Sequence, residues 1–516
     1  MSGFRQLSNL KLPGIVFFSV AFLFVGSAFG QSPVELIVNP QAPGSMIPTD
    51  FSGLSFPTGS EMKNHDGVAG YLFDSTNAEL ITLFRQLGIK NLRVGGTSVD
   101  EPGTNPTGSD IDALFRFAKA ADIKVIYSVR LLNGNSGEDA SIAKYVWKNY
   151  RRYLDCFAIG NEPDWHSYHI KDPEIYETTP GVPGSAYPSY LAKWKRFATA
   201  ILDSVPAARF TGPDAGSNYP VPGAKNTTYD GKTWATNFAQ DIANWHFPHS
   251  GSLAFVSQHN YVGQGSVGQG LTPREMICQM LSPKWVTSYY PLLYNAIGTP
   301  ALPQGIGYRL TESNSFSGGV AGGSDCFATA LFALDYMHWW AEHNCAGVNF
   351  HTAPWKYNGT IYLDADGNYR IHPMGYGIKA FDLGGHGRVE PVTIKNLDSF
   401  NLTAYAVNDS GVLYITIINK EHGAVAHNAN VRLQTSGHIS GRPEVVYLTS
   451  PHDNPAATSG IRLGDARVTE KWLWKGTWTS LSPDSCRESA GIAVCGVKVP
   501  PTSAAIVRIE TGRSHR

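Results

Sequence analysis

The chain has 516 residues, of which 16% are charged, and its formal net charge is −1 at pH 7. A chain of this length can bury one large hydrophobic core and a second, smaller one. The near-neutral balance argues against nucleic acid and other polyanions as tight partners, because these require a strongly basic face. Aromatic residues reach 12%, which suits either a cleft lined for sugars or simply a large core.

Residues 1–30 have the three parts of an export signal. Arg5 and Lys11 give a basic start, residues 15–25 are apolar, and residues 27–30 include small side chains for cleavage before Gln31. The alternative is a membrane anchor, but the apolar run is well short of the roughly 20 residues that span a bilayer. We therefore expect a secreted protein, periplasmic or extracellular, with no membrane partner. Loss of the signal would take the net charge to about −3 by count.

Between residues 51 and 352, short apolar runs alternate with helical stretches, which is typical of βα units. The clearest helical spacing covers residues 77–87 and 325–342. A doubly wound sheet fits the same pattern, but polar residues follow several different strands, as they do in a barrel. The sequence predicts an α/β fold with a (β/α)₈ TIM barrel. The eight expected strands are residues 53–56, 91–94, 124–129, 156–160, 209–212, 255–257, 308–311 and 347–350.

After about residue 380 the pattern changes to strands separated by polar and Pro-rich turns. This predicts a C-terminal all-β sandwich domain, which residues 34–38 are expected to join. The expected organisation is a signal at 1–30, an N-terminal strand region at 31–50, a catalytic barrel at 51–379 and a β-sandwich at 380–516. The expected strands of the sandwich are residues 402–407, 412–419, 466–468 and 504–509.

The chain contains six cysteines, an even number that permits disulfides in an exported protein. We expect Cys486 and Cys495 to form one bond that closes a small late loop. Cys156 lies in an apolar run and is expected to be a buried thiol. The chain has no C-x-x-C pair, which argues against a structural zinc site.

Two glutamates each close a short apolar run, Glu162 after residues 157–161 and Glu312 after residues 308–311. Pro163 biases Glu162 away from a helix. An acidic side chain after an apolar strand costs free energy if it is buried without a partner. A solvated loop carboxylate is the plain alternative for either residue alone. Two carboxylates at strand ends are what cleavage of a glycosidic bond requires.

Other polar and aromatic residues follow the same set of strands. His259 and Tyr261 are expected either to orient Glu312 or to bind a sugar hydroxyl, although a core histidine and an ordinary aromatic residue remain alternatives. Arg93 lies near the end of an early strand and is expected to form a structural ion pair with a carboxylate. His351, Trp355 and Tyr357 follow the last strand, where an aromatic platform for sugars is plausible.

The motifs around the two glutamates resemble those of retaining glycoside hydrolases with a (β/α)₈ barrel and glutamates after strands four and seven. Residues 160–164, Gly-Asn-Glu-Pro-Asp, and residues 311–315, Thr-Glu-Ser-Asn-Ser, carry this resemblance. Residues 92–96, 259–261 and 346–351 and the terminal β-sandwich are similar to the β-glucuronidase and heparanase family. The resemblance implies that Glu312 is the nucleophile, that Glu162 is the acid/base, and that Asn161 binds the 2-hydroxyl of the sugar.

The chain departs from this family at two points. Pro57 stands where the family often has a glutamate, and Glu61 is the candidate substitute; Thr97 stands where the family often has Asn. The Gly-rich stretch 318–323 precedes an expected helix start at Asp325. A uronate carboxylate is expected to bind the backbone near Ser317 and Gly319 there, although an ordinary Gly-rich turn is an equal alternative.

The expected function is a secreted exo-β-glycosidase of the retaining type, with β-glucuronides as first choice and a neutral β-glycoside as the alternative. We expect a small glycoside or oligosaccharide as partner, and no cofactor or metal. Three other classes are alternatives. His166 and His169 suggest a metal hydrolase, but H-E-x-x-H is absent; a serine hydrolase lacks G-x-S-x-G. A non-catalytic carbohydrate-binding barrel remains possible. The oligomeric state stays open.

Overall fold

A computed structural model describes most of the chain, and the part from Pro33 to Arg516 forms one compact unit. The expected export signal, His166 and His169 lie outside the described residues. None of the helices within the described part combines the length and the apolar character that crossing a bilayer requires. The described residues are 32–65, 67–165, 171–216, 228–229, 231–263, 270–397, 400–489 and 491–511.

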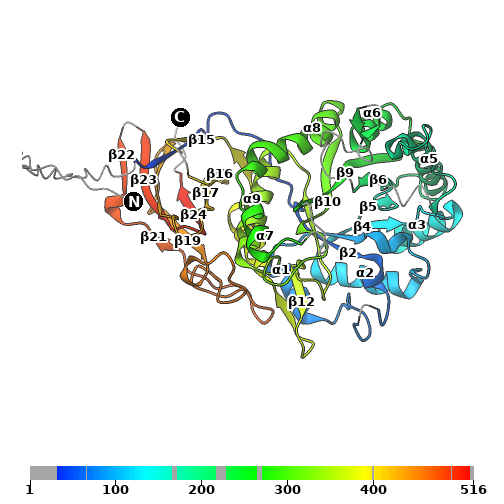
Figure 1. The fold of residues 1–516 in the computed structure, drawn as a ribbon, viewed down its shortest axis with the longest axis horizontal. Helices are drawn as coiled ribbons and strands as arrows, with labels where there is room; N and C mark the ends of the chain where they lie inside the picture. Colours follow the sequence, from blue (N-terminus) through cyan, green and yellow to red (C-terminus); the bar gives the residue numbers. More distant parts are fainter. Residues whose placement is uncertain are drawn as a thin grey trace, which may run out of the picture. The chain divides into compact units, whose positions relative to one another are not determined.

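Eight parallel strands close into a barrel, which confirms the predicted fold class and excludes a doubly wound sheet (Figure 1). The order around the barrel is β10-β11-β2-β3-β4-β5-β6-β9. Each of the eight expected strands is present, and the strands that contain residues 255–257 and 308–311 are longer than expected. The barrel strands are β2 Ser52–Pro57, β3 Asn91–Gly95, β4 Lys124–Val129, β5 Leu154–Ile159, β6 Arg209–Ala215, β9 Ser252–Gly263, β10 Gly307–Phe316 and β11 Val348–His351.

Helices cover the outside of the barrel, and several begin at a polar side chain that caps their free N–H groups. Thr107 and Asp110 form a reciprocal capping box at the start of α2, and Thr272 and Glu275 do the same for α7. The helices are α1 Ala78–Gln86, α2 Gly108–Ala121, α3 Ser136–Tyr150, α5 Tyr187–Ser204, α6 Trp234–Ala243, α7 Pro273–Met280, α8 Tyr290–Ala301, α9 Phe327–Glu342 and α10 Pro373–Gly384.

Short elements fill the connections. The 3₁₀ turns η1 Thr58–Glu61 and η2 Thr97–Asp100 follow the first two barrel strands. Among the described residues, the connections between barrel strands include a hairpin between β7 Thr228–Tyr229 and β8 Lys232–Thr233, and another hairpin joins β12 Ile361–Leu363 to β13 Tyr369–Ile371.

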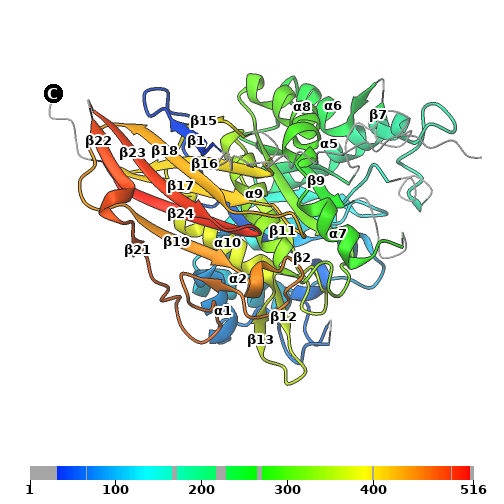
Figure 2. The ribbon, with the colours of Figure 1, turned by 60° about the vertical axis from the view of Figure 1, so that its left-hand side comes forward.

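Two sheets form the β domain (Figure 2). A five-stranded sheet has the order β15-β1-β18-β23-β22, and a seven-stranded sheet runs β14-β16-β17-β24-β19-β20, with β21 (Thr479–Ser480) also pairing with β19. The strands are β1 Val34–Val38, β14 Arg388–Glu390, β15 Val392–Lys395, β16 Leu402–Asp409, β17 Val412–Asn419, β18 Ala429–Ser436, β19 Glu444–Thr449, β20 Arg462–Leu463, β22 Cys486–Ser489, β23 Ile492–Val499 and β24 Ser503–Glu510.

The structure corrects two expectations in this part of the chain. The expected strand at 466–468 is wrong, because Ala466 makes only an isolated bridge to Leu463. The expected domain boundary after residue 379 falls inside α10. The disulfide between Cys486 and Cys495 is confirmed, and Cys156 is a buried free thiol.

The seven-stranded sheet is apolar on both faces and contributes to two cores. Ile417 and Val507 pack with the five-stranded sheet, whereas Ile418 and Ile506 belong to the large core that contains α9 and α10. This alternation follows from the two-residue period of a strand. Helix α9 is buried from Phe327 to Ala341. Because α9 is buried along this length, apolar residues occur on all of its sides.

Candidate active site

The barrel brings Glu162 and Glu312 together at the carboxyl ends of its strands. One carboxylate oxygen of each glutamate and one ring nitrogen of His259 all lie within 4.8 Å of one another. Glu312 lies in β10 beside an irregularity in the pairing with β9, between Leu310 and Glu312. Such bulges re-aim side chains next to functional sites. Glu162 follows β5 and has φ +47°, a conformation that non-glycine residues adopt at a cost.

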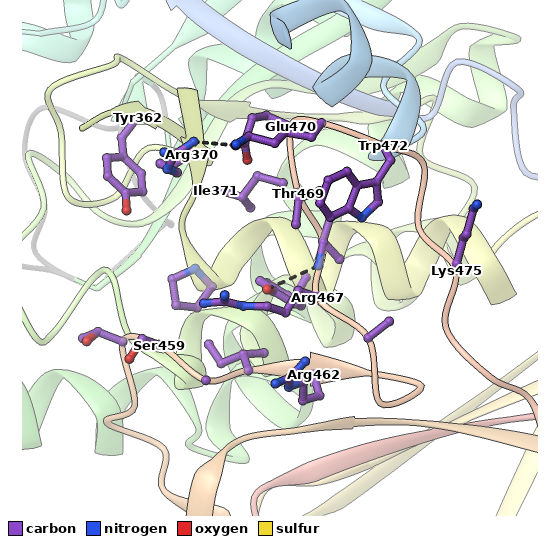
Figure 3. A pocket seen from close by; sticks show the side chains of 18 residues that line it. Tyr362, Arg370, Ile371, Ser459, Arg462, Arg467, Thr469, Glu470, Trp472 and Lys475 are labelled. Atoms are coloured by element: carbon purple, nitrogen blue, oxygen red, sulfur yellow. Dashed lines mark hydrogen bonds and ion pairs between the residues drawn. The ribbon is translucent and has the colours of Figure 1, made fainter. Parts of the chain in front are cut away.

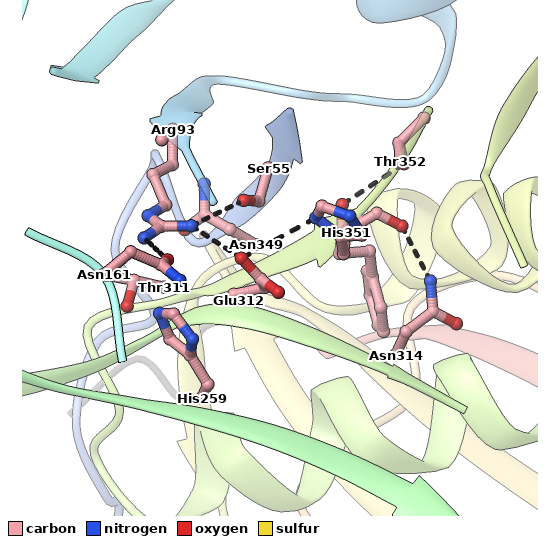
Figure 4. A network of polar contacts seen from close by, with 12 residues as sticks. Ser55, Arg93, Asn161, His259, Thr311, Glu312, Asn314, Asn349, His351 and Thr352 are labelled. Atoms are coloured by element: carbon pink, nitrogen blue, oxygen red, sulfur yellow. Dashed lines mark hydrogen bonds and ion pairs between the residues drawn. The ribbon is translucent and has the colours of Figure 1, made fainter. Parts of the chain in front are cut away.

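Arg93 in β3 joins side chains of β2, β6 and β10 and of the turn after β5, and Figure 4 shows its bonds to Ser55, Asn161 and Glu312. Its Nη1 donates to Glu312 Oε2 at 2.7 Å and to Ser55 Oγ at 3.2 Å. Its Nη2 donates to Asn161 Oδ1 at 2.7 Å and to Asp214 Oδ2 at 3.0 Å. The guanidinium is fully buried, so the two carboxylates are needed to compensate its charge. The expected ion pair of Arg93 is therefore present, and its partner is one of the two central glutamates.

His259 contacts the other glutamate. Its Nδ1 lies 2.8 Å from Glu162 Oε1, and its Nε2 lies 3.9 Å from Asp214 Oδ2. Burial alone would lower the pKa of His259, but the carboxylates of Glu312, Asp214 and Glu162 outweigh it and raise this pKa to about 9. The imidazolium therefore donates to Glu162 at neutral pH. The expectation that His259 orients Glu312 is corrected, because its hydrogen bond goes to Glu162.

Glu312 is held as a carboxylate by its neighbours. Burial would raise its pKa, but the positive charges around it and the hydroxyl of Tyr261, 2.7 Å from Oε1, lower it well below its usual range. His351 Nδ1 lies 3.7 Å from Oε2. Burial lowers the pKa of His351 to about 4. At neutral pH the charges that stabilise Glu312 are therefore those of Arg93 and His259.

Glu162 has the opposite tendency. Burial raises its pKa, the hydrogen bond from His259 opposes this, and the charge of Glu312 adds to the rise. Its side chain is 19% exposed, against 8% for that of Glu312. The site thus contains one carboxyl that favours its proton beside one that favours ionisation. This division of roles is the one that acid/base chemistry with two carboxylates uses.

Hydrogen bonds to Asp100 and Asp214 hold the turn that carries Asn161 and Glu162. Asp100 Oδ2 accepts from the backbone N–H of Asn161 at 3.2 Å, while its Oδ1 accepts from Leu131 and Leu132 at 3.0 and 2.9 Å. The N–H of Glu162 donates to the carbonyl of Asp214 at 2.9 Å. These contacts hold the strained backbone of Glu162 in place. Because Asn161 Oδ1 accepts from Arg93, its amide NH₂ is left as the group that can donate to a ligand.

Trp165 and Gly216 lie close to Glu162. A Cβ atom added to Gly216 would meet the Trp165 indole nitrogen at 2.2 Å and the Glu162 carboxyl carbon at 2.4 Å. The backbone of residue 216 therefore approaches both side chains as closely as only glycine allows. Trp165 is 50% exposed, so its indole is accessible next to the acid.

Glu61 is not brought to the pair. It is 1% exposed, and Tyr127 OH donates to its Oε1 at 3.1 Å. Tyr127 packs on Phe115 of α2, so it points out of the barrel toward the helices. Glu61 therefore lies behind the strands, and burial raises its pKa to about 8. Its expected role as a substitute at the sugar cleft is not supported by these contacts.

The expected anion cradle also differs from the structure. Helix α9 begins at Phe327, and the N–H groups of Phe327 and Ala328 donate to the carbonyls of Ala457 and Pro455. Carbonyls of the β domain therefore occupy the helix start that was expected to attract a uronate. Asp325 accepts from the N–H of Gly322 instead of capping the helix.

The loop after β10 is held against the loop after β11. Asn314 Nδ2 donates to the carbonyls of His351 and Asn358, both at 2.7 Å. Gly319 packs on Asn358, where an added Cβ would meet the backbone nitrogen at 2.6 Å. Ser317 is exposed and Tyr357 is 50% exposed. These residues lie on the two loops that follow Glu312 and His351, but no contact joins Ser317, Gly319 or Tyr357 to either glutamate among the described residues.

Asp214, Asp100 and Trp165 were missed by the sequence analysis. Asp214 follows the expected strand 209–212, and it therefore carries the same signal, a carboxylate closing a strand, that singled out Glu162 and Glu312. Thr311 Oγ1 donates to its Oδ1 at 2.7 Å. The role of Asp100 had no such signal, because its partners are backbone groups of distant loops.

Glu162, His259 and Glu312 offer the ligand types that a metal ion accepts. Arg93 lies 2.7 Å from Glu312, however, and His259 with a pKa of about 9 is protonated at neutral pH. A metal ion would have to displace the proton of His259, and its positive charge would be repelled by Arg93. We assign no metal to this site.

The fold is similar to that of several solved carbohydrate-active enzymes. A 4-O-α-L-rhamnosyl-β-D-glucuronidase from Fusarium oxysporum 12S, solved as a Rha-GlcA complex, superposes with a TM-score of 0.66 at 14% identity over 92% of this chain and 99% of that one. A GH51 arabinofuranosidase from Xanthomonas axonopodis pv. citri superposes with a TM-score of 0.64 at 13% identity, over 92% of this chain and 99% of that one. CelM2, a bifunctional glucanase-xylanase from a metagenome library, superposes with a TM-score of 0.60 at 15% identity, over 93% of this chain and 99% of that one.

No protein-family model and no curated protein sequence matches the chain. At identities of 13 to 15% the structural likenesses establish the fold alone.

Proposed function

We propose that the protein is a retaining glycoside hydrolase in which Glu312 is the nucleophile and Glu162 is the acid/base. The observation that carries this proposal is the pair itself: two carboxyl oxygens within 4.8 Å of each other, one pKa raised and the other lowered. Retaining enzymes place their carboxyl groups about 5 to 5.5 Å apart, whereas inverting enzymes leave room for a water at about 6.5 to 9.5 Å. The similarity of the fold to the enzymes above supports this choice.

The proposed reaction has two steps. The Glu312 carboxylate attacks the anomeric carbon while Glu162 gives its proton to the departing glycosidic oxygen, which leaves a covalent glycosyl-enzyme. Glu162 then takes a proton from water, and that water attacks the same carbon and releases Glu312. The imidazolium of His259 stabilises the Glu162 carboxylate formed between the steps. The amide NH₂ of Asn161 is the proposed donor to the 2-hydroxyl.

For the substrate we propose exo-acting cleavage of β-glucuronides, by a secreted enzyme. Lys356 supports the uronate, because its Nζ lies 3.1 Å from His351 Nε2 and so brings a positive charge to the group beside Glu312. The exposed backbone near Ser317 can add N–H donors. The rhamnosyl-glucuronidase named above has a similar fold. The export signal expected at residues 1–30 and the disulfide support secretion.

A neutral β-glycoside is the second candidate. It is favoured by one observation: the start of α9 is capped by carbonyls of the β domain and cannot serve a uronate. A preference for aryl β-glucoside over aryl β-glucuronide in kcat/KM would select this candidate and leave the two-glutamate chemistry unchanged.

The test compares the wild type with Glu312→Ala and Glu162→Ala on a panel of aryl β-glycosides (uronide, glucoside, xyloside and galactoside). Glu312→Ala should abolish turnover. Glu162→Ala should harm substrates with poor leaving groups most, and azide should partly restore turnover of activated ones, because azide needs no base. NMR of the first product should show retention. An inverted product, or equal losses on every substrate without azide rescue, would contradict the proposal.

A further inference from the structure

The structure contains a cavity whose lining includes neither of the two glutamates, and Figure 3 shows the side chains that line it. It has a volume of about 590 Å³ and lies between the β12–β13 hairpin of the barrel and residues 458–475 of the β domain. None of its lining residues hydrogen-bonds or ion-pairs with Glu162 or Glu312 in the described part of the chain. Its size is that of a site for a small ligand or a short stretch of a polymer.

The lining is strongly basic. Arg370 is compensated, since it pairs with Asp364 at 3.0 Å and with Glu470. Four more cations line the cavity and are exposed, and among the described residues no carboxylate lies within ion-pair distance of any of them. They are Arg462, Arg467, Lys471 and Lys475. Four uncompensated like charges around one concave surface repel one another, so an anion that binds there relieves this repulsion.

The remaining lining suits a sugar. Trp472 is 58% exposed at this cavity, and an exposed indole offers a flat apolar face with one N–H donor. Thr458 and Ser459 add hydroxyls. Cations, hydroxyls and an aromatic face together match an anionic carbohydrate better than a bare phosphate, which needs no aromatic surface.

We propose that this cavity binds a stretch of an acidic saccharide, carrying carboxylate or sulfate groups, without cleaving it. The ionic contacts are assigned to Arg462, Arg467, Lys471 and Lys475, and the stacking contact to Trp472. Binding there does not depend on the hydrolytic activity proposed above.

One segment of the chain lies next to both the glutamate site and the cavity. It leaves β11 at His351, carries Lys356, and then forms the β12–β13 hairpin. The N–H of Leu363 donates to the carbonyl of Pro354 at 3.0 Å, which ties the hairpin to the loop beside His351. If the proposed function holds, a polymer bound at the cavity raises the local concentration of chain ends near the glutamates.

The experiment uses the full-length Glu312→Ala protein, so that no ligand is consumed. Calorimetry with an oligogalacturonide and with a heparin oligosaccharide distinguishes carboxylate from sulfate recognition. We expect at least one to bind, with an affinity that falls as salt rises. Arg462→Gln with Arg467→Gln should weaken binding by at least about tenfold, because two of the four cations that contact the anion are removed. Trp472→Ala should weaken it as well.

The matched control is Lys119→Gln with Lys144→Gln, which removes two exposed charges from α2 and α3. This control should leave binding unchanged. Equal weakening by the cavity double variant and by the control would show that binding results from general electrostatic attraction, and it would contradict the proposed site. Absence of binding by both saccharides would overturn it too. Equal affinity for single-stranded DNA would overturn the assignment to carbohydrate. Turnover of aryl β-glycosides by the cavity variants is measured separately, so failure of the proposed hydrolysis is distinguishable from failure of this site.

Discussion

Arg93 sets the charge state of Glu312 by direct contact at 2.7 Å. Its removal would leave Glu312 and Asp214 buried without their cation, and breaking a buried pair in this way costs about 3 to 5 kcal/mol. Arg93 variants would therefore report on folding before they report on catalysis. Tyr261 reaches the other oxygen of Glu312 and offers a milder probe.

Tyr261→Phe removes one hydrogen bond to Glu312 while keeping the ring. The pKa of Glu312 should rise, so the acidic limb of the kcat/KM profile should move to higher pH. We expect kcat to fall about 10- to 100-fold, since a hydrogen bond to a charged group contributes about 1.5 to 3 kcal/mol. The measurement is a pH–rate profile with an aryl β-glycoside. Tyr405→Phe, which loses a bond to buried Asp335, is the control and should leave the limb in place. An unmoved limb in Tyr261→Phe would disprove the contact.

Glu61→Gln should change how stability depends on pH. Burial raises the pKa of Glu61 to about 8, so the folded state keeps a proton that the unfolded state loses above its ordinary pKa. Wild-type stability contributed by this group is thus present at low pH and is lost as pH rises toward 8. Gln cannot titrate. Between pH 5 and 8 the free energy of unfolding of the variant should therefore fall less than that of the wild type, by on the order of 4 kcal/mol. Urea unfolding at both pH values measures this, and parallel pH dependences would contradict it.

The turn after β5 is the element on which the acid depends. Asp100→Ala removes the acceptor of three backbone N–H groups, so we expect a loss of about 3 kcal/mol in the free energy of unfolding. Because the turn carries Glu162, substrates with poor leaving groups should lose more rate than activated ones. Asp74→Ala is the control, since Asp74 also accepts a backbone N–H, that of Thr76, in another loop and forms no ion pair among the described residues. A uniform loss across leaving groups in Asp100→Ala would reduce Asp100 to a purely structural role.

Strands were predictable because their apolar runs are local, and the barrel followed from eight such runs separated by helices. The residues at which helices begin were harder to predict from the sequence. The sequence pointed to Asp325, yet α9 begins at Phe327 because its first N–H groups find carbonyls about 130 residues later in the chain, at Pro455 and Ala457. The partner of His259 was missed for the same reason: Glu162 and Glu312 are both nearby in the barrel, and spacing along the chain does not rank them.

For the whole molecule, the formal net charge of −1 concealed a local basic surface. A sum over the chain carries no information on where charges gather, and the cations at 462, 467, 471 and 475 line one cavity in the folded protein. The early argument against polyanions therefore holds for the molecule on average and not for this cavity.

The barrel and the β domain are joined by a buried charge pair. Lys420 Nζ lies 2.6 Å from Asp335 Oδ2 on α9, and Thr403 and Tyr405 donate to the other oxygen at 2.6 and 2.7 Å. Lys420→Met leaves a buried carboxylate without its cation and should cost about 3 to 5 kcal/mol. The expected result is a lower midpoint in urea with unchanged kcat on an aryl β-glycoside.

Two variants complete that experiment. Lys395→Met alters an exposed lysine of β15 and should leave the midpoint unchanged. Asp335→Asn combined with Lys420→Met should recover part of the loss, since no uncompensated charge remains. A loss below about 1 kcal/mol for Lys420→Met alone would place the pair among weak surface contacts.

The position of β1 has a consequence for how the protein is made. This strand is synthesised before every other described strand but lies between β15 and β18, pairing Leu36 with Ile394 and with Leu433. At about 5 to 20 residues per second, the roughly 350 residues that separate it from β15 take about 20 to 70 s to synthesise. Throughout that time an apolar strand has neither of its neighbours. The five-stranded sheet can therefore be completed only after the last of its strands, β23, has been synthesised.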